Sequence, residues 1–175
     1  MGEIRRGSQA AFEALFDRYR EPIWRFFRRR TPDPGVAQEL AQDTFVALLE
    51  GARRYKAKGM FRSYLFGVAY NVLLADRRKR VQRQTEPIDA DLASAATADR
   101  EDVIWIREAL AALDDRDREI LMLREYEELS YQEIADLRGI PLNTVRSQLF
   151  RARMALKAAL EARTLAPVRS THGGH

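Results

Sequence analysis

The stretch 129–156, LSYQEIADLRGIPLNTVRSQLFRARMAL, constrains the fold most because it contains local signals for two helices and the turn between them. Ser130, with Glu133 three residues later, forms a capping box, which predicts that a helix begins directly after the serine. Gly139 can adopt the left-handed conformation that ends a helix, and Pro141 suits the first turn of the next one. Such a tightly joined pair is typical of a helix-turn-helix, whose second helix enters the DNA major groove.

The second of these helices is predicted to have two different faces. At 3.6 residues per turn, its buried stripe consists of Leu142, Val145, Leu149, Ala152 and Leu156. The opposite face carries Asn143, Thr144, Ser147, Phe150 and Arg151, and the basic flank carries Arg146, Arg153 and Lys157. The outer face suits hydrogen bonding to an anionic surface. A solvated helix with scattered arginines and a helical hairpin that binds no DNA are the alternatives at this point.

The charge of the chain is unevenly distributed. The 175 residues have a net charge of +4, but residues 1–83 carry 18 Lys and Arg against 9 Asp and Glu. Residues 84–136 carry 5 against 16, and residues 137–175 carry 7 against 1, so the three net charges are +9, −11 and +6. Two basic regions around an acidic middle indicate two separate contacts with a polyanion, joined by a segment that avoids it.

The pattern of apolar residues predicts an all-α chain with two small helical domains. Ser8 and Asp33 are candidate helix N-caps, and Pro34 follows the second of them. Pro22 either kinks the first helix or starts a new segment. The stretch QTEPIDADLASAATADR has the composition of a flexible linker. The predicted parts are a first domain at 1–83, the acidic linker at 84–100, a helix-turn-helix domain at 101–163 and a disordered tail at 164–175.

The helix expected from Val36 to Glu50 has an acidic outer face. Its buried side is predicted to hold Ala37, Leu40, Ala41, Thr44, Phe45 and Leu48. Its outer side holds Glu39, Gln42, Asp43, Val46 and Glu50. An acidic face around an exposed valine, in a domain with twice as many basic as acidic residues, favours docking of a protein over contact with DNA. An ordinary solvated helix face is the alternative.

The last helix of the first domain combines aromatic and basic residues. Its predicted core stripe is Phe61, Leu65, Val68 and Val72. Predicted to lie away from that stripe are Phe66, Tyr70 and Asn71, next to Arg77 and Arg78, with Tyr55, Lys56 and Lys58 in the preceding loop. Aromatic rings can stack on unpaired bases while cations hold phosphates, so this surface is a candidate site for single-stranded nucleic acid. Packing under a neighbouring helix is an equally good interpretation for Phe66 and the less favoured one for Tyr70.

Composition and motifs argue against several other classes of protein. The chain has no cysteine, so it has neither disulfides nor thiolate zinc ligands, and a redox trigger would belong to a partner. No signal peptide or membrane-length apolar run is recognisable, which predicts a cytoplasmic protein without membrane insertion. There is no glycine-rich phosphate loop, and His172 and His175 lie in the predicted tail. We therefore expect no catalytic site, metal or cofactor.

Two blocks of the chain resemble extracytoplasmic-function (ECF) sigma factors of bacterial RNA polymerase. ELAQDTFVALLE followed by FRSYLFGVAYNVLLADRRKR is similar to sigma region two. LDDRDREILMLREYEELSYQEIADLRGIPLNTVRSQLFRARMAL is similar to sigma region four. The resemblance extends from about Ala11 to Leu160 and includes the acidic linker. It implies an alternative sigma factor that binds core RNA polymerase and directs promoter-specific initiation.

The resemblance also implies roles for individual residues. Docking on the clamp helices of polymerase β′ would involve Glu39, Gln42, Asp43 and Val46. Recognition and opening of the minus-ten element, with capture of a flipped base, would involve Tyr55, Lys56, Lys58, Phe61, Tyr64, Tyr70, Asn71, Arg77 and Arg78. Reading of the duplex minus-thirty-five element would involve Asn143, Thr144, Ser147 and Arg151, with Arg146 and Arg153 mainly on phosphates. The polymerase β flap and an anti-sigma factor are the further partners implied.

Some positions depart from the family pattern. Tyr64, Gly67 and Tyr70 stand where the family usually has tryptophan, a basic residue and arginine. In the recognition helix, Asn143 replaces a frequent glycine and Gln148 a frequent arginine. The promoter sequence of relatives therefore does not transfer to this chain.

Two rival functions use the same helix-turn-helix. A transcriptional regulator without a sigma role would need a receiver or ligand-binding domain and a dimer interface, and the basic helical first half offers neither clearly. A DNA-processing enzyme such as a recombinase would need a nucleophile with converging arginines, and Ser63 and Ser147 stand in the wrong contexts for that role.

Overall fold

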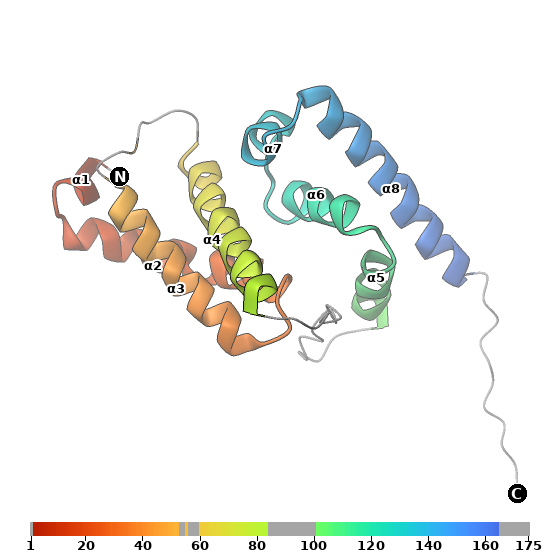
Figure 1. Cartoon of the computed structure of the whole chain (residues 1–175), viewed down its shortest axis with the longest axis horizontal. Coiled ribbons are helices and arrows are strands. Elements are labelled where there is room, and N and C mark those ends of the chain that lie inside the picture. The colour runs from red at the N-terminus through yellow and green to blue at the C-terminus, as the bar shows by residue number, and fades with distance from the viewer. Residues whose placement is uncertain (1, 53–54, 56–59, 84–100, 165–175) are drawn as a thin grey trace, which may run out of the picture. The chain divides into compact units, whose positions relative to one another are not determined.

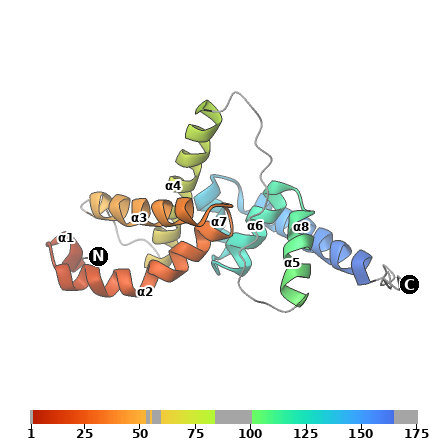
Figure 2. The same cartoon turned by 90° about the horizontal axis from the view of Figure 1, so that it is seen from below.

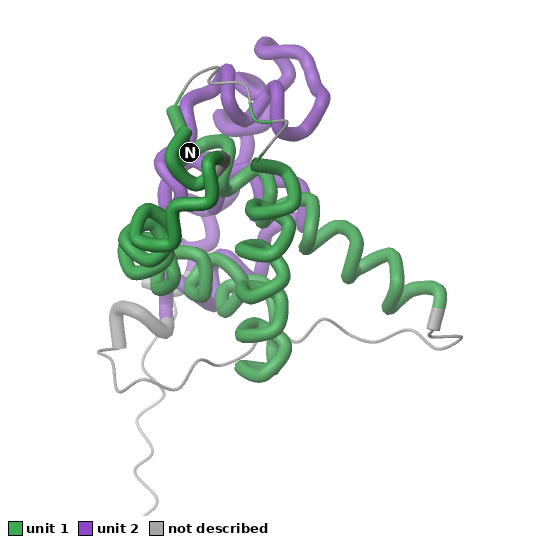
Figure 3. The backbone as a smooth tube through the Cα atoms, turned by 90° about the vertical axis from the view of Figure 1, so that its left-hand side faces the viewer, with its two compact units in different colours: residues 1–96 green, residues 97–175 purple. Residues whose placement is uncertain are grey.

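The computed structural model describes residues 2–52, 55, 60–83 and 101–164, which include eight helices (Figure 1). The chain divides into two compact units, residues 1–96 and 97–175 (Figure 3). The prediction of an all-α protein with two helical domains is confirmed. The predicted linker at 84–100 and residues 165–175 of the predicted tail lie outside the described residues, and Thr164 is the last residue of a helix.

Unit 1 contains a short α1 (Gly2–Arg5) and three longer helices, α2 (Gln9–Arg28), α3 (Pro34–Gly51) and α4 (Phe61–Arg83), which pack against one another. Ser8 caps α2, as predicted, because its Oγ accepts a hydrogen bond from the N–H of Ala11 at 3.3 Å. The helix continues through Pro22 without a break. The fully buried side chains include Ile23, Phe26, Phe27, Leu48, Leu65, Phe66 and Leu73.

The turn between α2 and α3 is held by side chains at both helix ends. The buried Arg28 donates to the carbonyl oxygens of Thr31 and Pro32, at 3.0 and 3.2 Å. Asp33 accepts a hydrogen bond from the N–H of Gly35 at 2.7 Å, and Pro34 opens α3. The predicted cap and first-turn proline are therefore confirmed, and they fix where α3 begins.

The buried face of α4 differs from the prediction. Tyr70 was expected on the outside but is only 6% exposed, and Phe66, for which burial was an equally good interpretation, is 1% exposed. Val68 and Val72, expected in the core, are only half-buried. Apolar residues occur almost all around this helix, so their spacing does not select one stripe. Both α2 and α3 pack on α4, and the buried arc is rotated by roughly 100°, one residue step, from the predicted one.

Unit 2 contains α5 (Glu101–Ala111), α6 (Asp115–Glu125), α7 (Tyr131–Arg138) and α8 (Leu142–Thr164), and the first three of these pack against α8 (Figures 1 and 2). The predicted capping box is present, because Ser130 Oγ accepts from the N–H of Glu133 at 3.2 Å and Glu133 accepts from the N–H of Ser130 at 2.7 Å. The predicted stripe of α8 is buried at Val145, Leu149 and Ala152.

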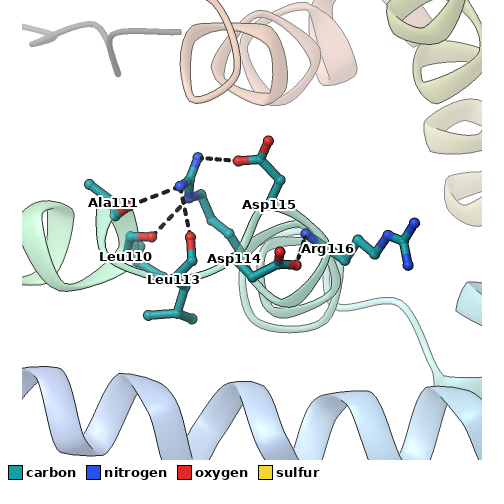
Figure 4. A network of polar contacts seen from close by, with 7 residues as sticks. Leu110, Ala111, Leu113, Asp114, Asp115 and Arg116 are labelled. Carbon is teal, nitrogen blue, oxygen red and sulfur yellow. Dashed lines mark hydrogen bonds and ion pairs between the residues drawn. The ribbon is translucent and has the colours of Figure 1, made fainter. Parts of the chain in front are cut away.

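The turn between α5 and α6 is closed by one guanidinium group (Figure 4). Arg118 donates to the carbonyl oxygens of Leu110, Ala111 and Leu113 at distances of 2.8–3.0 Å and pairs with Asp115 at 3.1 Å. The last carbonyls of a helix have no partner within that helix. Arg118 supplies donors to the last two carbonyls of α5 and, through Leu113 and Asp115, joins the end of α5 to the start of α6.

Gly139 ends α7 in the left-handed conformation, with φ = 62° and ψ = 35°. A Cβ atom at this position would meet nothing within 4 Å, so a side chain would strain only the backbone. We expect Gly139→Ala to lower the free energy of unfolding of unit 2 by about 1–2 kcal/mol. Gly139→Asn is the control and should lose less, because asparagine tolerates this conformation better. Urea denaturation measures both, and an equal loss would contradict the backbone explanation.

Candidate protein-docking and nucleic-acid interfaces

The outer face of α3 is acidic, exposed and partly apolar. Glu39, Gln42 and Asp43 are exposed, and Val46 is 53% exposed beside them. Leu49, which the sequence analysis did not single out, is also 43% exposed and lies three residues after Val46, on the same side of the helix. Two accessible apolar side chains among carboxylates suit a protein partner, because a phosphate backbone would be repelled.

Four half-buried aromatic residues form a cluster in unit 1. The rings of Tyr55, Phe61 and Tyr64 contact one another, with centroid distances of 6.3 Å from Tyr55 to Phe61, 4.5 Å from Tyr55 to Tyr64 and 6.4 Å from Phe61 to Tyr64. Phe61 also contacts Tyr19 of α2 at 5.7 Å in an edge-to-face arrangement. We call Tyr19, Tyr55, Phe61 and Tyr64 the aromatic cluster. Sequence reasoning missed Tyr19 because it precedes the other three by more than thirty residues.

The structure separates the other predicted minus-ten residues from this cluster. Tyr70 is buried, so its predicted place on an exposed stacking surface is wrong. Asn71, Arg77 and Arg78 are exposed on α4, but Arg77 follows Tyr64 by thirteen residues, or about 20 Å along the helix axis. Lys56 and Lys58 lie outside the described residues. Unit 1 therefore presents the aromatic cluster near the start of α4 and exposed basic residues further along that helix.

The outer face of α8 carries the polar residues that the sequence predicted there. Asn143, Arg146 and Ser147 are exposed, and Thr144 is half-buried. Asn143 accepts a hydrogen bond from Arg146 at 3.1 Å, and Ser147 donates to the carbonyl of Thr144 at 3.0 Å. These side chains are thus ordered along the helix while their remaining donors and acceptors face outward.

Two arginines of α8 differ in how firmly they are held. Arg151 is 66% exposed, and its nearest described ion-pair distance is 4.0 Å, to Asp117. Arg153 is 47% exposed and lies 2.8 Å from Glu125, and it donates to the Tyr131 hydroxyl at 3.1 Å. The hydrogen bonds to Glu125 and then to Tyr131 raise the pKa of Arg153. Arg151 therefore has more freedom to meet a ligand.

A hollow of about 330 Å³ lies between α5 and the end of α8. It is lined mainly by apolar residues, namely Trp105, Ala109, Ala112, Ala159, Leu160 and Ala162, with Glu108 at its side. Ala159 follows Asn143 by sixteen residues, so the hollow is about 24 Å along α8 from the polar start of the helix. Unit 2 therefore presents an apolar surface distinct from its polar one.

Within the described residues, no group of three or more His, Cys, Asp or Glu side chains is arranged to hold a metal ion. None of the described helices is long and apolar enough to span a bilayer.

Comparison with known proteins shows to which family the chain belongs. Sigma-70 region 2 matches residues 15–83, within unit 1, and Sigma-70 region 4 matches residues 104–156, within unit 2. RNA polymerase sigma factor YlaC of Bacillus subtilis is 33% identical over 156 residues, which cover 84% of this chain and 90% of that protein. ECF RNA polymerase sigma factor SigC of Mycobacterium tuberculosis is 32% identical over 165 residues, covering 89% and 86%. The chain belongs to the ECF sigma factors.

Solved structures support the fold of this ECF sigma factor. The sigma factor RpoE of Bartonella quintana, solved in complex with the anti-sigma factor NepR, superposes with a TM-score of 0.68 at 21% identity. That superposition covers 86% of this chain and 97% of the other. Membership of the family makes the chain an alternative sigma factor, a subunit for transcription initiation that acts with RNA polymerase and promoter DNA.

Proposed function

We propose that this sigma factor docks on the clamp helices of polymerase β′ through Glu39, Gln42, Asp43 and Val46. The observation that carries the proposal is the exposed acidic face of α3 within a basic domain. Carboxylates at such a rim steer a basic partner and repel DNA, and the exposed apolar pair Val46 and Leu49 would exclude water at the centre. Since core RNA polymerase works on the chromosome, we place the protein in the cytoplasm.

At the minus-ten element, we assign the aromatic cluster to an unpaired base and the exposed Asn71, Arg77 and Arg78 to the backbone of the opened strand. Extruding a base costs a few kcal/mol, and stacking on an aromatic ring offsets about 1–3 kcal/mol of this. Tyr55 and Tyr64 are half-buried, so their rings are already ordered before a base arrives. Lys56 and Lys58, which neighbour Tyr55 in the chain, would add backbone contacts.

At the minus-thirty-five element, we propose that α8 lies in the major groove with Asn143, Thr144, Ser147 and Arg151 at base edges or nearby phosphates. Arg146 would contact phosphates from the flank. The arrangement fits a recognition helix because the buried stripe of Val145, Leu149 and Ala152 faces the domain core, which leaves the polar side outward. Contacts to base edges would give the preference for a sequence, and contacts to phosphates would give affinity and fix the position of the helix.

Two further protein partners are proposed. The apolar hollow between α5 and α8 is the surface that we assign to the β flap, because it is remote from the polar start of α8 and would bury an apolar helix. An anti-sigma factor is proposed because the matching Bartonella structure is a complex of a sigma factor with one. The absence of cysteine would leave any redox trigger of release to that partner.

Promoter-directed initiation tests the sigma function as a whole. Core RNA polymerase is mixed with the full chain and fragmented bacterial genomic DNA, and the transcript starts are sequenced. We expect starts downstream of a shared pair of elements, with permanganate-reactive thymines that mark open DNA, and weak promoter binding by the chain alone. If the chain bound duplex equally well without polymerase and produced no starts with it, a regulator without a sigma role would replace the proposal.

Arg151→Ala is expected to change which upstream sequence is selected. A bidentate arginine contact to a guanine contributes about 1–3 kcal/mol of discrimination, so preference at one position should fall roughly tenfold. The comparison is Arg146→Ala, which should reduce the salt slope by about 0.9. Arg146 also donates to Asn143, so any change of preference that it causes should leave the position read by Arg151 unchanged. Selection from a randomised upstream duplex with the holoenzyme measures both effects. An unchanged selected sequence for Arg151→Ala would remove the base-edge assignment.

A further inference from the structure

Arg153, which the sequence analysis placed on phosphates, makes the shortest ion pair in the described part of α8. Its Nη2 lies 2.8 Å from Glu125 Oε1 at the end of α6. Its Nη1 donates to the hydroxyl of Tyr131, the first residue of α7, at 3.1 Å. We call Arg153, Glu125 and Tyr131 the Arg153 cluster. It joins α6, α7 and α8 at one point.

The partners of Arg153 are themselves held in place. The guanidinium of Arg124 lies over the Tyr131 ring at 5.5 Å from its centroid, and Arg124 also donates to the carbonyl of Leu129 at 3.0 Å. Tyr131 directly follows Ser130, the N-cap of α7. The Arg153 cluster is therefore connected to the α6–α7 loop and the start of α7, and the charge of its guanidinium is already balanced by Glu125.

The Arg153 cluster adds a directional contact to the packing of α8 against α5, α6 and α7. The buried residues of α8, Val145, Leu149 and Ala152, form one narrow stripe, and apolar contacts are not directional. Reading base edges requires side chains oriented to within roughly 10–20°. Arg153 is eleven residues beyond Leu142, about 16 Å along the axis from the α7–α8 turn. It therefore supplies a directional contact far from the first attachment point.

We propose that Arg153 is a positioning residue for promoter recognition and makes no phosphate contact. Through Glu125 and Tyr131 it sets the rotation of α8 about its own axis, so that Asn143, Ser147 and Arg151 face the bases together. The inference rests on the proposed function, in which α8 contacts the base edges of the minus-thirty-five duplex. It makes Glu125, an acidic residue that never meets DNA, a determinant of sequence preference.

A charge swap separates positioning from phosphate contact. Arg153→Glu and Glu125→Arg each break the pair, whereas the double variant restores it with reversed sign and still allows the Tyr131 hydroxyl to donate to a carboxylate. In the full chain, the amide NMR resonances from Asn143 to Arg151 should shift in both single variants and return in the double variant. Shifts confined to residues within one turn of position 153 would overturn the proposal without any use of DNA.

Binding to DNA gives the second readout. The probes are the upstream duplex that the unsubstituted holoenzyme selects from a randomised pool and a scrambled duplex of the same composition. The single variants should lose about tenfold in preference for the selected duplex, and the double variant should recover to within about threefold. Double-variant holoenzyme that binds as poorly as the Arg153→Glu holoenzyme would show that the arginine itself touches DNA.

A neutral variant and a matched control complete the test. Arg153→Gln should leave affinity and salt slope for the scrambled duplex unchanged, whereas loss of a phosphate contact would lower that slope by about 0.9. Lys157→Gln removes the same charge from α8, where Lys157 pairs with Glu161 of its own helix at 3.6 Å, and should not alter preference. If the unsubstituted holoenzyme selects no upstream duplex, the proposed reading fails, and the NMR result still decides whether Arg153 positions α8.

Discussion

Replacing Asp43 by arginine is expected to weaken binding of this sigma factor to core RNA polymerase by about ten- to hundredfold, which corresponds to roughly 1.4–2.8 kcal/mol. Asp43 is exposed on α3, so the substitution removes no buried contact and the chain should unfold at the same temperature. The loss arises because a cation replaces a carboxylate opposite a basic partner, and like charges brought together at an interface repel. Titration of core enzyme with labelled full chain at two salt concentrations measures the effect, which should be smaller at high salt.

The control for Asp43 is Asp17→Arg, the same substitution on a different helix of unit 1. Asp17 is exposed on α2 and belongs to no proposed interface, so binding should stay within about twofold of the unsubstituted chain. Both variants change the net charge of the chain equally, so a general electrostatic effect would weaken both. An Asp43→Arg chain with unchanged affinity would exclude the α3 face as the docking surface.

Replacing Arg118 by methionine is expected to lower the free energy of unfolding of unit 2 by about 3 kcal/mol. The Arg118 side chain is only 17% exposed and donates to the carbonyl oxygens of Leu110 and Ala111, at the end of α5, and of Leu113 in the turn that follows (Figure 4). Methionine has a similar apolar length but no donor, so all three carbonyls would lose the guanidinium group, although the Leu110 oxygen would keep the N–H of Leu113 at 3.2 Å. The expected value is less than the sum of three charged hydrogen bonds because water can reach part of the site.

Urea denaturation followed by the fluorescence of Trp105 measures this loss in the full chain. The chain contains two tryptophans, and the Trp24→Phe background leaves Trp105 as the reporter for unit 2. The control is Arg116→Met, two residues away, whose exposed side chain should cost less than about 0.5 kcal/mol. The backbone bonds of Arg116, to Asp114 and Arg138, do not depend on its side chain. Equal losses in the two variants would contradict the role of Arg118.

Local helix signals were predictable because each depends on residues close together in the chain. The capping box of Ser130 and Glu133 and the Asp33–Pro34 start of α3 need only a few consecutive residues, and both are present in the structure. The two faces of α3 also followed from spacing, since the six residues predicted on its inner side are buried and Glu39, Gln42, Asp43 and Val46 are exposed. The roles of its exposed residues in polymerase binding remain predictions.

The face of α4 was not predictable in the same way. This helix is apolar nearly all around, because Phe66, Val68, Tyr70 and Val72 point in different directions. Only contact with α2 and α3 selected which of them are buried. The aromatic cluster likewise includes Tyr19, from α2, because the packing of α2 brings it against Phe61. Periodicity describes one helix at a time, so it contains no information about which neighbour will cover it.

The sequence by itself determined the helices, their caps, the helix-turn-helix and the family, since helix capping and hydrophobic spacing act over one or two turns. Only the tertiary structure decided which polar side chains form ion pairs or hydrogen bonds with other residues of the protein. Arg151 and Arg153 are two residues apart and alike in sequence, yet Glu125, twenty-eight residues before Arg153, holds only Arg153 at 2.8 Å. Ion pairs form where folding brings opposite charges within a few ångströms, and that proximity exists only after the helices have packed.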